Sequence, residues 1–243
     1  MKRTHKNILR VFIVFVILGA FLFYRYGRSV WHPMMVRLRG QRTVEEVQKQ
    51  YGMSARERLH RDFEKAGLSD TPERVAFLVF KAEKRLELWA GRYDGWAHIK
   101  DYPVLAASGH AGPKLREGDR QVPEGIYRIE YLNPNSSYHL SMKLNYPNEF
   151  DLEKAREEGR KNPGSDIFIH GKDVSIGCIA VGDLAIEELF GLVSRIGRDK
   201  VTVLIAPNDL RNAQPVTDMQ AVPKWLPEVY EALSRELQSF KRN

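Results

Sequence analysis

The sequence predicts a β-rich α+β domain with flanking helices and a membrane anchor at its N-terminus. Short strand-like apolar stretches, separated by turn-forming residues, fill residues 71–207 and leave room for few helices. Helix-like amphipathic stretches lie before and after this region. An uncharged apolar run lies near the N-terminus. The chain has 243 residues, 43% of them hydrophobic, which is enough to bury a core without disulfides.

Residues 1–30 have the pattern of an export signal. A positively charged stretch comes first, and the mostly apolar run VFIVFVILGAFLFY then spans residues 11–24. The run is shorter than the roughly 20 residues that a spanning helix needs, although Ile8 and Leu9 extend it. A candidate cleavage site at 18–20 lies inside the run, so we expect an uncleaved anchor. Basic residues are similarly frequent on both sides, so they do not set the orientation.

Residues 31–70 are expected to form a helical prefix that packs on the domain as a spacer. Thr43 with Glu46, and Ser54 with Glu57, each fit a capping box, in which side chains accept hydrogen bonds from main-chain N–H groups at a helix start. Gly52 precedes the second box, so we expect two short helices separated at this glycine.

Residues 71–207 are expected to form the main domain. A stretch rich in Gly, Pro and charge at 109–125 predicts a long loop, and the polar stretch 149–164 predicts a helical or looped excursion. A helix is expected at 183–195, with Asp183 as its N-cap. The expected strands cover residues 75–80, 86–90, 96–108, 126–129, 139–144, 166–170 and 201–206.

The tail, residues 208–243, is expected to be helical over 222–240. Its apolar side chains recur at helical spacing and form one face. Packing of this face on the domain is the preferred interpretation, and recruitment of a partner by an anchored scaffold is the alternative.

Charge and cysteine content narrow the classes of function. The net charge of +7 indicates either a solvated basic surface or attraction to an anionic membrane or polymer. The basic residues are scattered and match no nucleic-acid-binding motif, so nucleic acid is not expected as a partner. The single cysteine excludes an intramolecular disulfide and a thiolate zinc site. We expect no metal and no cofactor.

The segment IFIHGKDVSIGCIAVGD carries the candidate chemistry. A strand leads to His170, and Cys178 follows after a short loop. A cysteine reacts as the thiolate, and a histidine is its usual base because the pKa of imidazole lies near neutral. Gly177 lets the backbone pass close to a substrate, and the N–H groups of Gly177 and Cys178 could bind a developing oxyanion. A free cysteine is also common as an inert core residue, so this pair does not settle the function alone.

The stretch HGKDVSIGCIA resembles the signature of the YkuD-type L,D-transpeptidase catalytic domain, in which His-Gly is followed by Ser-x-Gly-Cys. The short gap between His and Cys is similar to that of the YafK-like subgroup. Further similar stretches are VFKAEKRLELWA, SGHAGPKLREGDRQVPEGIYRI and LNPNSSYHLSMKLNYPNEFD. The resemblance covers roughly residues 70–206.

The resemblance implies a β-sandwich or barrel-like domain that acts on the peptide stems of peptidoglycan at meso-diaminopimelate, through a cysteine thioester. It implies Cys178 as the nucleophile and His170 as the general base and acid. It also implies that Ser175 supports the loop, that Gly177 supplies an oxyanion N–H, and that Gly171 orients His170 through its carbonyl.

Three features depart from the common family pattern. Ile176 replaces a second His, Ala180 replaces an Arg, and the loop between His and Cys is short. An Arg is a natural partner for a carboxylate of the stem peptide. Three other basic residues are candidates to replace it in substrate binding, with solvated loop charges as the alternative reading: Lys114, Arg116 and Lys172.

Several functions stay open at this point. An amine that resolves the thioester would make the enzyme a transpeptidase in cell-wall biogenesis and cell shape. Water would make it a hydrolase that cuts cross-links or releases a wall-linked lipoprotein. A non-catalytic wall-binding module is a further alternative. The expected location is the inner membrane, held by the N-terminal anchor, with the catalytic domain in the periplasm.

Overall fold

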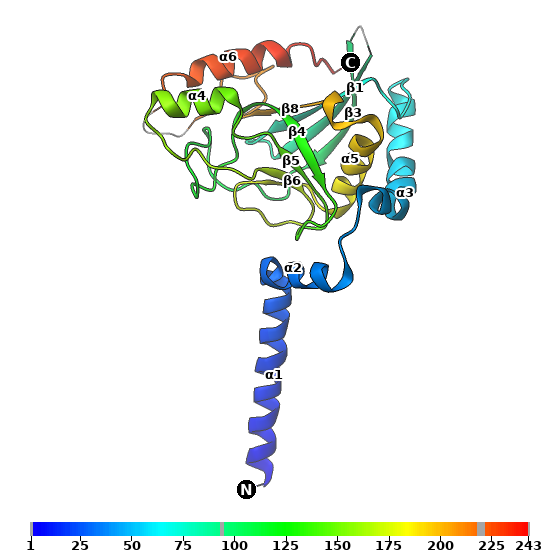
Figure 1. Cartoon of the computed structure of the whole chain (residues 1–243), viewed down its shortest axis with the longest axis vertical. Helices are drawn as coiled ribbons and strands as arrows, with labels where there is room; N and C mark the ends of the chain where they lie inside the picture. The colour runs from blue at the N-terminus through cyan, green and yellow to red at the C-terminus, as the bar shows by residue number, and fades with distance from the viewer. Residues whose placement is uncertain (1, 93–94, 218–221, 243) are drawn as a thin grey trace. The chain divides into compact units, whose positions relative to one another are not determined.

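The computed structural model describes residues 2–92, 95–217 and 222–242 (Figure 1). The chain forms two compact units, Met1–Arg42 and Thr43–Asn243. The first unit consists of α1 (Lys2–Tyr26) and α2 (Arg28–Arg39). Among the residues described, no helix combines the length and the apolar character that a membrane crossing requires. The predicted anchor over residues 1–30 is therefore not shown.

The second unit begins with one long helix, α3 (Val44–Lys65). Its start is confirmed: Thr43 and Glu46 form the predicted capping box. The predicted break at Gly52 is wrong, and so is the second capping box, because the hydroxyl of Ser54 donates to the carbonyl of Tyr51 inside the helix. One glycine costs a helix only about 1 kcal/mol. Packing of the buried side chains Ala55, Leu59 and Phe63 keeps the helix continuous across it.

Eight strands form one sheet in the order β3-β2-β1-β8-β4-β5-β6-β7. The strands β1 and β8 run parallel at its centre, and β6 and β7 run parallel at one end. Every other neighbouring pair is antiparallel. Their bounds are β1 Arg74–Phe80, β2 Arg85–Arg92, β3 Gly95–Pro103, β4 Gly125–Asn133, β5 Ser141–Leu144, β6 Phe168–His170, β7 Ile179–Ala180 and β8 Val201–Ala206.

The sheet curves until its two ends approach each other. The predicted third strand ends at Pro103 rather than at residue 108, and the chain then turns towards β7. There the N–H of Leu105 donates to the carbonyl of Ala180 at 2.8 Å, and the N–H of Ala180 donates to the carbonyl of Ala106 at 2.9 Å. This bridge sets the loop after β3 beside β7, which is the strand that follows Cys178.

The central strand β1 is buried on both faces, because helices cover both sides of the sheet there. Side chains alternate between the faces of a strand. Val75, Phe77 and Val79 accordingly join the core that includes α3 and α5 (Asp183–Ile196). The alternate residues of β1 join the core that includes α6 (Leu226–Leu237). Figure 1 shows α3 and α5 on one side of the sheet and α6, with α4 (Glu149–Glu157), on the other.

The β-rich fold with flanking helices is therefore confirmed. The tail helix packs its apolar face on the sheet through Leu226, Leu233 and Leu237, which are fully buried. The two-residue strand β7 was not predicted, and the expected strand at 139–144 begins only at Ser141, because His139 has a φ of 77°. The N-cap of α5 is Gly182 rather than Asp183, which is the first helical residue.

Candidate active site

His170 is the last residue of β6 and is almost completely buried. Its Nδ1 lies 2.6 Å from the carbonyl oxygen of Gly171. Its ring packs against the ring of Tyr138, with 4.6 Å between the ring centroids. Burial lowers the pKa of His170, and the Gly171 carbonyl opposes this only in part. The imidazole is therefore held in one orientation and is neutral near pH 7.

Cys178 directly precedes β7, and its side chain is partly exposed. Burial of the thiol raises the pKa of Cys178. A main-chain hydrogen bond at Phe168 and the charge of Lys114 lower this pKa, while the charge of Asp166 raises it. The net direction is upward, so the sulfur is a thiol near pH 7 and needs a base to react.

Pairing of β6 with β7 brings the two residues together. In the parallel register, Ile169 faces Ile179 and His170 faces Ala180, so Cys178 lies on the segment beside β6. Sγ of Cys178 lies 3.6 Å from the carbonyl oxygen of Asp166, which is its hydrogen-bond acceptor among the residues described. The imidazole thus lies on β6 and the thiol directly before the neighbouring strand β7, and each has its own main-chain partner.

Two serine hydroxyls hold the loop around the cysteine. Ser175 Oγ accepts a hydrogen bond from the N–H of Cys178 at 2.9 Å and donates one to the Cys178 carbonyl at 2.7 Å. Ser108 Oγ accepts from the N–H of Gly177 and donates to the carbonyl of Arg120 at 2.8 Å. The two N–H groups predicted to bind an oxyanion therefore donate to hydroxyls in this conformation.

The contact between Ser108 and Gly177 was not predicted from the sequence. Ser108 lies 69 residues before Gly177, and only the bridge between the loop after β3 and β7 brings the two together. A serine next to a glycine is common in loops. No local sequence pattern therefore distinguishes Ser108 from other loop serines.

Gly171 must be a glycine for steric reasons. A Cβ at this position would lie 2.7 Å from Oδ1 of Asp183 and 2.7 Å from the carbonyl oxygen of Tyr138. Contacts of this length do not occur for real Cβ atoms. The glycine lets the chain pass between these groups and points its own carbonyl at the ring of His170.

Two of the three candidate substrate-binding cations already have carboxylate partners. Lys172 forms an ion pair with Asp183, which also accepts the N–H of Lys172 at 2.9 Å. Lys114 is buried, with Nζ 2.7 Å from Oδ1 of Asp119. These lysines neutralise carboxylates inside the loops that surround the site.

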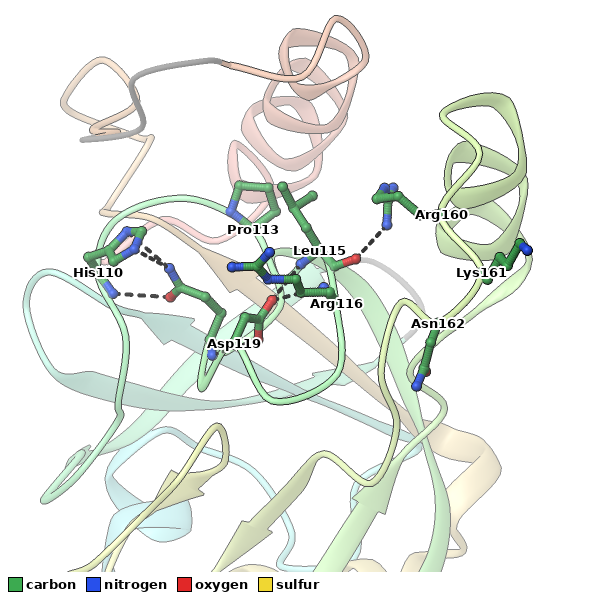
Figure 2. A pocket seen from close by; sticks show the side chains of 9 residues that line it. His110, Pro113, Leu115, Arg116, Asp119, Arg160, Lys161 and Asn162 are labelled. Carbon is green, nitrogen blue, oxygen red and sulfur yellow. Dashed lines mark hydrogen bonds between the residues drawn. The ribbon is translucent and has the colours of Figure 1, made fainter.

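Arg116, the third candidate, is exposed and lines a pocket of about 600 Å³ (Figure 2). This pocket lies between the loop at 109–125 and the segment that follows α4. It lies beside the thiol and not at it, since Cys178 is not among the residues that line it. They are His110, Pro113, Leu115, Arg116, Asp119, Gln121, Arg160, Lys161 and Asn162.

The described residues contain no group of three or more His, Cys, Asp or Glu side chains placed to hold a metal ion. The site offers instead a neutral imidazole, a protonated thiol directly before the adjacent strand, and a pocket nearby that is lined by basic residues. The imidazole and the thiol are of the types that a nucleophilic acyl transfer uses.

Comparison with known proteins identifies related sequences. The model of the L,D-transpeptidase catalytic domain family, YkuD, matches residues 74–205. The chain is 33% identical over 144 residues to "Putative L,D-transpeptidase YafK" of Escherichia coli strain K12, which covers 57% of this chain and 56% of that protein. The same values hold for the protein of that name from Escherichia coli O157:H7. The chain thus matches little more than half the length of these relatives.

Similar solved structures have TM-scores below 0.5. One is the helical cell shape determining protein Pgp2 of Campylobacter jejuni in its K307A form, with a TM-score of 0.47 and 20% identity. That match covers 68% of this chain and 52% of Pgp2. Another is Bd1075 of Bdellovibrio bacteriovorus, with a TM-score of 0.41, 23% identity, and coverage of 70% and 58%.

Proposed function

This chain belongs to the YkuD family of L,D-transpeptidase catalytic domains, and we propose that it transfers acyl groups of peptidoglycan stem peptides through a thioester on Cys178. The observation that carries the proposal is the hydrogen bond from His170 Nδ1 to the carbonyl of Gly171. A carbonyl only accepts, so the proton is on Nδ1 and the lone pair is on Nε2. The ring is therefore prepared to take a proton.

In the proposed reaction, Nε2 of His170 takes the proton of Cys178, whose thiol leaves the Asp166 carbonyl. The sulfur forms a bond to the carbonyl carbon of diaminopimelate in the L,D-bond, and negative charge moves to the carbonyl oxygen. When this oxyanion collapses, the carbon–nitrogen bond breaks and the leaving amine takes the proton from His170. The enzyme is left as a thioester.

The second half-reaction decides the type of enzyme. An amine that attacks the thioester gives an exchanged or cross-linked product, and water gives hydrolysis, including release of a wall-linked lipoprotein. Hydrolysis is the second candidate function, because Cys178 is partly exposed and solvent can reach a thioester on its sulfur.

We propose that the N–H groups of Gly177 and Cys178 bind the oxyanion. Each must exchange its present hydroxyl acceptor, Ser108 or Ser175, for the substrate oxygen. Both hydroxyls belong to side chains in loop segments. Charged oxygen is also the stronger acceptor for an N–H donor.

We also propose that the protein lies at the inner membrane with its catalytic domain in the periplasm. The positively charged and apolar N-terminal segment supports export to the periplasm and association with the inner membrane through residues 1–30. Fractionation of cells that express the full chain tests this. The protein should sediment with membranes and be degraded by protease added to spheroplasts, whereas protection from that protease would contradict a periplasmic domain.

The enzymatic proposal is tested by mixing the full chain with disaccharide tetrapeptide and separating the products by liquid chromatography with mass spectrometry. Wild-type protein should consume the muropeptide, and Cys178→Ala should not while keeping the circular dichroism spectrum. Exchange products would identify a transpeptidase and shortened stems a hydrolase. Equal turnover by Cys178→Ala would refute the nucleophile. A folded wild-type protein that only binds the muropeptide would be the wall-binding module.

A further inference from the structure

We propose that the pocket between the loop at 109–125 and the segment after α4 is a carboxylate-binding subsite, in which Arg116 and Arg160 hold a carboxylate of the substrate. This inference rests on the proposed function, since it assigns the part of the acyl donor that lies beside the thiol. The pocket of about 600 Å³ is large enough for part of a peptide.

The two arginines come from different segments and line the same pocket. Arg116 belongs to the loop, and Arg160 follows the C-terminal end of α4. Figure 2 shows Arg116 on one side of Leu115 and Arg160 on the other. A carboxylate has two oxygens and accepts from several N–H donors at once, which suits a position between two guanidinium groups.

The guanidinium of Arg116 is available for a ligand. Within the described part of the chain, its main-chain N–H donates to Asp119 at 2.9 Å and its carbonyl accepts from Lys114, but its guanidinium has no such partner. An exposed arginine without a carboxylate partner gives the pocket an unmatched positive charge.

Arg160 is already oriented by the protein. Its Nη1 donates to the carbonyl of Leu115 at 2.8 Å, and its Nε pairs with Glu158 at 2.6 Å. Glu158 balances the charge of Arg160, so Arg160 offers a ligand the N–H groups that these contacts leave, while the unmatched positive charge comes from Arg116. Such preorganisation reduces the entropy that a ligand must overcome on binding.

The carboxylate of Asp119, in the pocket wall, repels an anion only weakly, because residues of the same loop neutralise its charge. Asp119 pairs with Lys114 and accepts three main-chain N–H groups, from Leu115, Arg116 and Gln121. The same contacts lower the pKa of Asp119 despite its burial. Lys161 adds a further positive charge at the rim, where its side chain extends away from Arg116 in Figure 2.

The pocket is linked to the thiol through Gln121. The side chain of Gln121 lines the pocket, while its carbonyl oxygen lies 3.5 Å from the Cβ position of Gly177, the residue before Cys178. The charge of Lys114, at the base of the loop, is also close enough to affect the pKa of the Cys178 thiol. In the proposed binding mode, a stem peptide whose carbonyl reaches the sulfur extends past Gln121 to the arginines.

The test measures binding apart from catalysis. Full-length Cys178→Ala is titrated with disaccharide tetrapeptide by calorimetry, and then with the same muropeptide after its free carboxylates are amidated. Arg116→Gln is added to this background, and Arg128→Gln serves as the matched control. Arg128 is likewise exposed, but it lies on β4 outside the pocket.

We expect Arg116→Gln and amidation each to raise the Kd at least about ten-fold, and together to have little more effect than either alone. Arg128→Gln should leave the Kd unchanged. Equal Kd values for Arg116→Gln and Arg128→Gln, or for the acid and the amide, would overturn the subsite. If wild-type protein formed no thioester but Arg116→Gln still raised the Kd, the proposed reaction would be refuted and the carboxylate subsite would be supported.

Discussion

Nδ1 of His170 donates a hydrogen bond to the carbonyl oxygen of Gly171 across 2.6 Å, and this single contact decides which ring nitrogen can act as a base. The carbonyl belongs to the next residue in the chain, so the orientation of the ring is set by local backbone geometry. Gly171 in turn passes between Asp183 and Tyr138, where no other residue fits. The orientation of the proposed base therefore depends on a glycine.

Replacement of His170 by Gln should make Cys178 at least about ten-fold less reactive to iodoacetamide at pH 7. Burial raises the pKa of the thiol, so little thiolate forms without a base. The rate is measured by mass spectrometry of the alkylated chain. His60→Gln is the control, since His60 lies exposed on α3. Equal rates in the two variants would remove His170 from the role of base.

The pH dependence of kcat/KM should show an acid limb below pH 6.5. Burial lowers the pKa of His170 from its ordinary value of 6.5, and the base must be neutral to work. Activity therefore rises as pH increases through that lowered pKa and is not limited by this group at neutral pH. An acid limb with its midpoint above 6.5 would contradict the assignment of this residue.

Gly171→Ala should lower the free energy of unfolding by about 1–3 kcal/mol, because the added methyl group meets a main-chain carbonyl that cannot easily move. Urea denaturation followed by circular dichroism measures the loss. Gly95→Ala is the matched control, since a Cβ at Gly95 meets nothing within 4 Å. A loss no larger than that of the control would show that the chain is less crowded than the structure indicates.

Ser175→Ala should reduce kcat/KM about ten-fold or more while lowering the free energy of unfolding by only about 1 kcal/mol. The hydroxyl can go on donating to the Cys178 carbonyl when the Cys178 N–H turns to the substrate oxygen, so its loss frees the nucleophile to move. Ser175→Thr keeps the hydroxyl and should recover most of the activity. Ser165→Ala controls for the general effect of removing a loop hydroxyl. If Ser175→Ala and Ser165→Ala had the same kcat/KM, Ser175 would have no part in positioning the thiol.

Asp151 should make folding less favourable as pH rises from 4 to 7. Burial raises its pKa from 3.8 to about 6, so the folded protein holds the proton more tightly than the unfolded chain. Its contribution to stability is complete below pH 3.8 and is lost as pH rises through about 6. The loss amounts to at most about 3 kcal/mol.

Asp151→Asn tests this directly. The amide oxygen can still accept the N–H of Asn148 that caps α4, as the carboxylate does at 3.0 Å. The variant should therefore gain stability relative to wild type between pH 4 and pH 7 in urea denaturation. A constant difference over that range would mean that Asp151 titrates at its ordinary pKa.

The local patterns of the sequence were sufficient for most strands and for the family. Short apolar stretches bounded by turns predicted β1, β2 and β8 closely, and the Thr43 capping box predicted the start of α3. The segment from His170 to Cys178 combines a histidine, a cysteine and glycines within a few residues. Such short-range features are visible in a sequence because each residue contacts its neighbours in the chain.

Features that depend on distant contacts were not predictable in this way. The helix α3 runs through Gly52 because its far half packs on α5, which lies more than a hundred residues later. Ser108 reaches Gly177, and Arg160 reaches the Leu115 carbonyl, only after the sheet has curved and the loops have closed. No local pattern distinguishes such residues from solvated ones, so the pocket beside the thiol required the structure.

The most direct test of the central claim is intact-protein mass spectrometry of the full chain mixed with disaccharide tetrapeptide. We predict a covalent adduct on Cys178 of wild-type protein with the mass of the acyl part of the muropeptide, and none on Cys178→Ala. An unmodified wild-type protein that is folded, that reacts with iodoacetamide at Cys178, and that leaves the muropeptide unchanged would contradict the thioester mechanism.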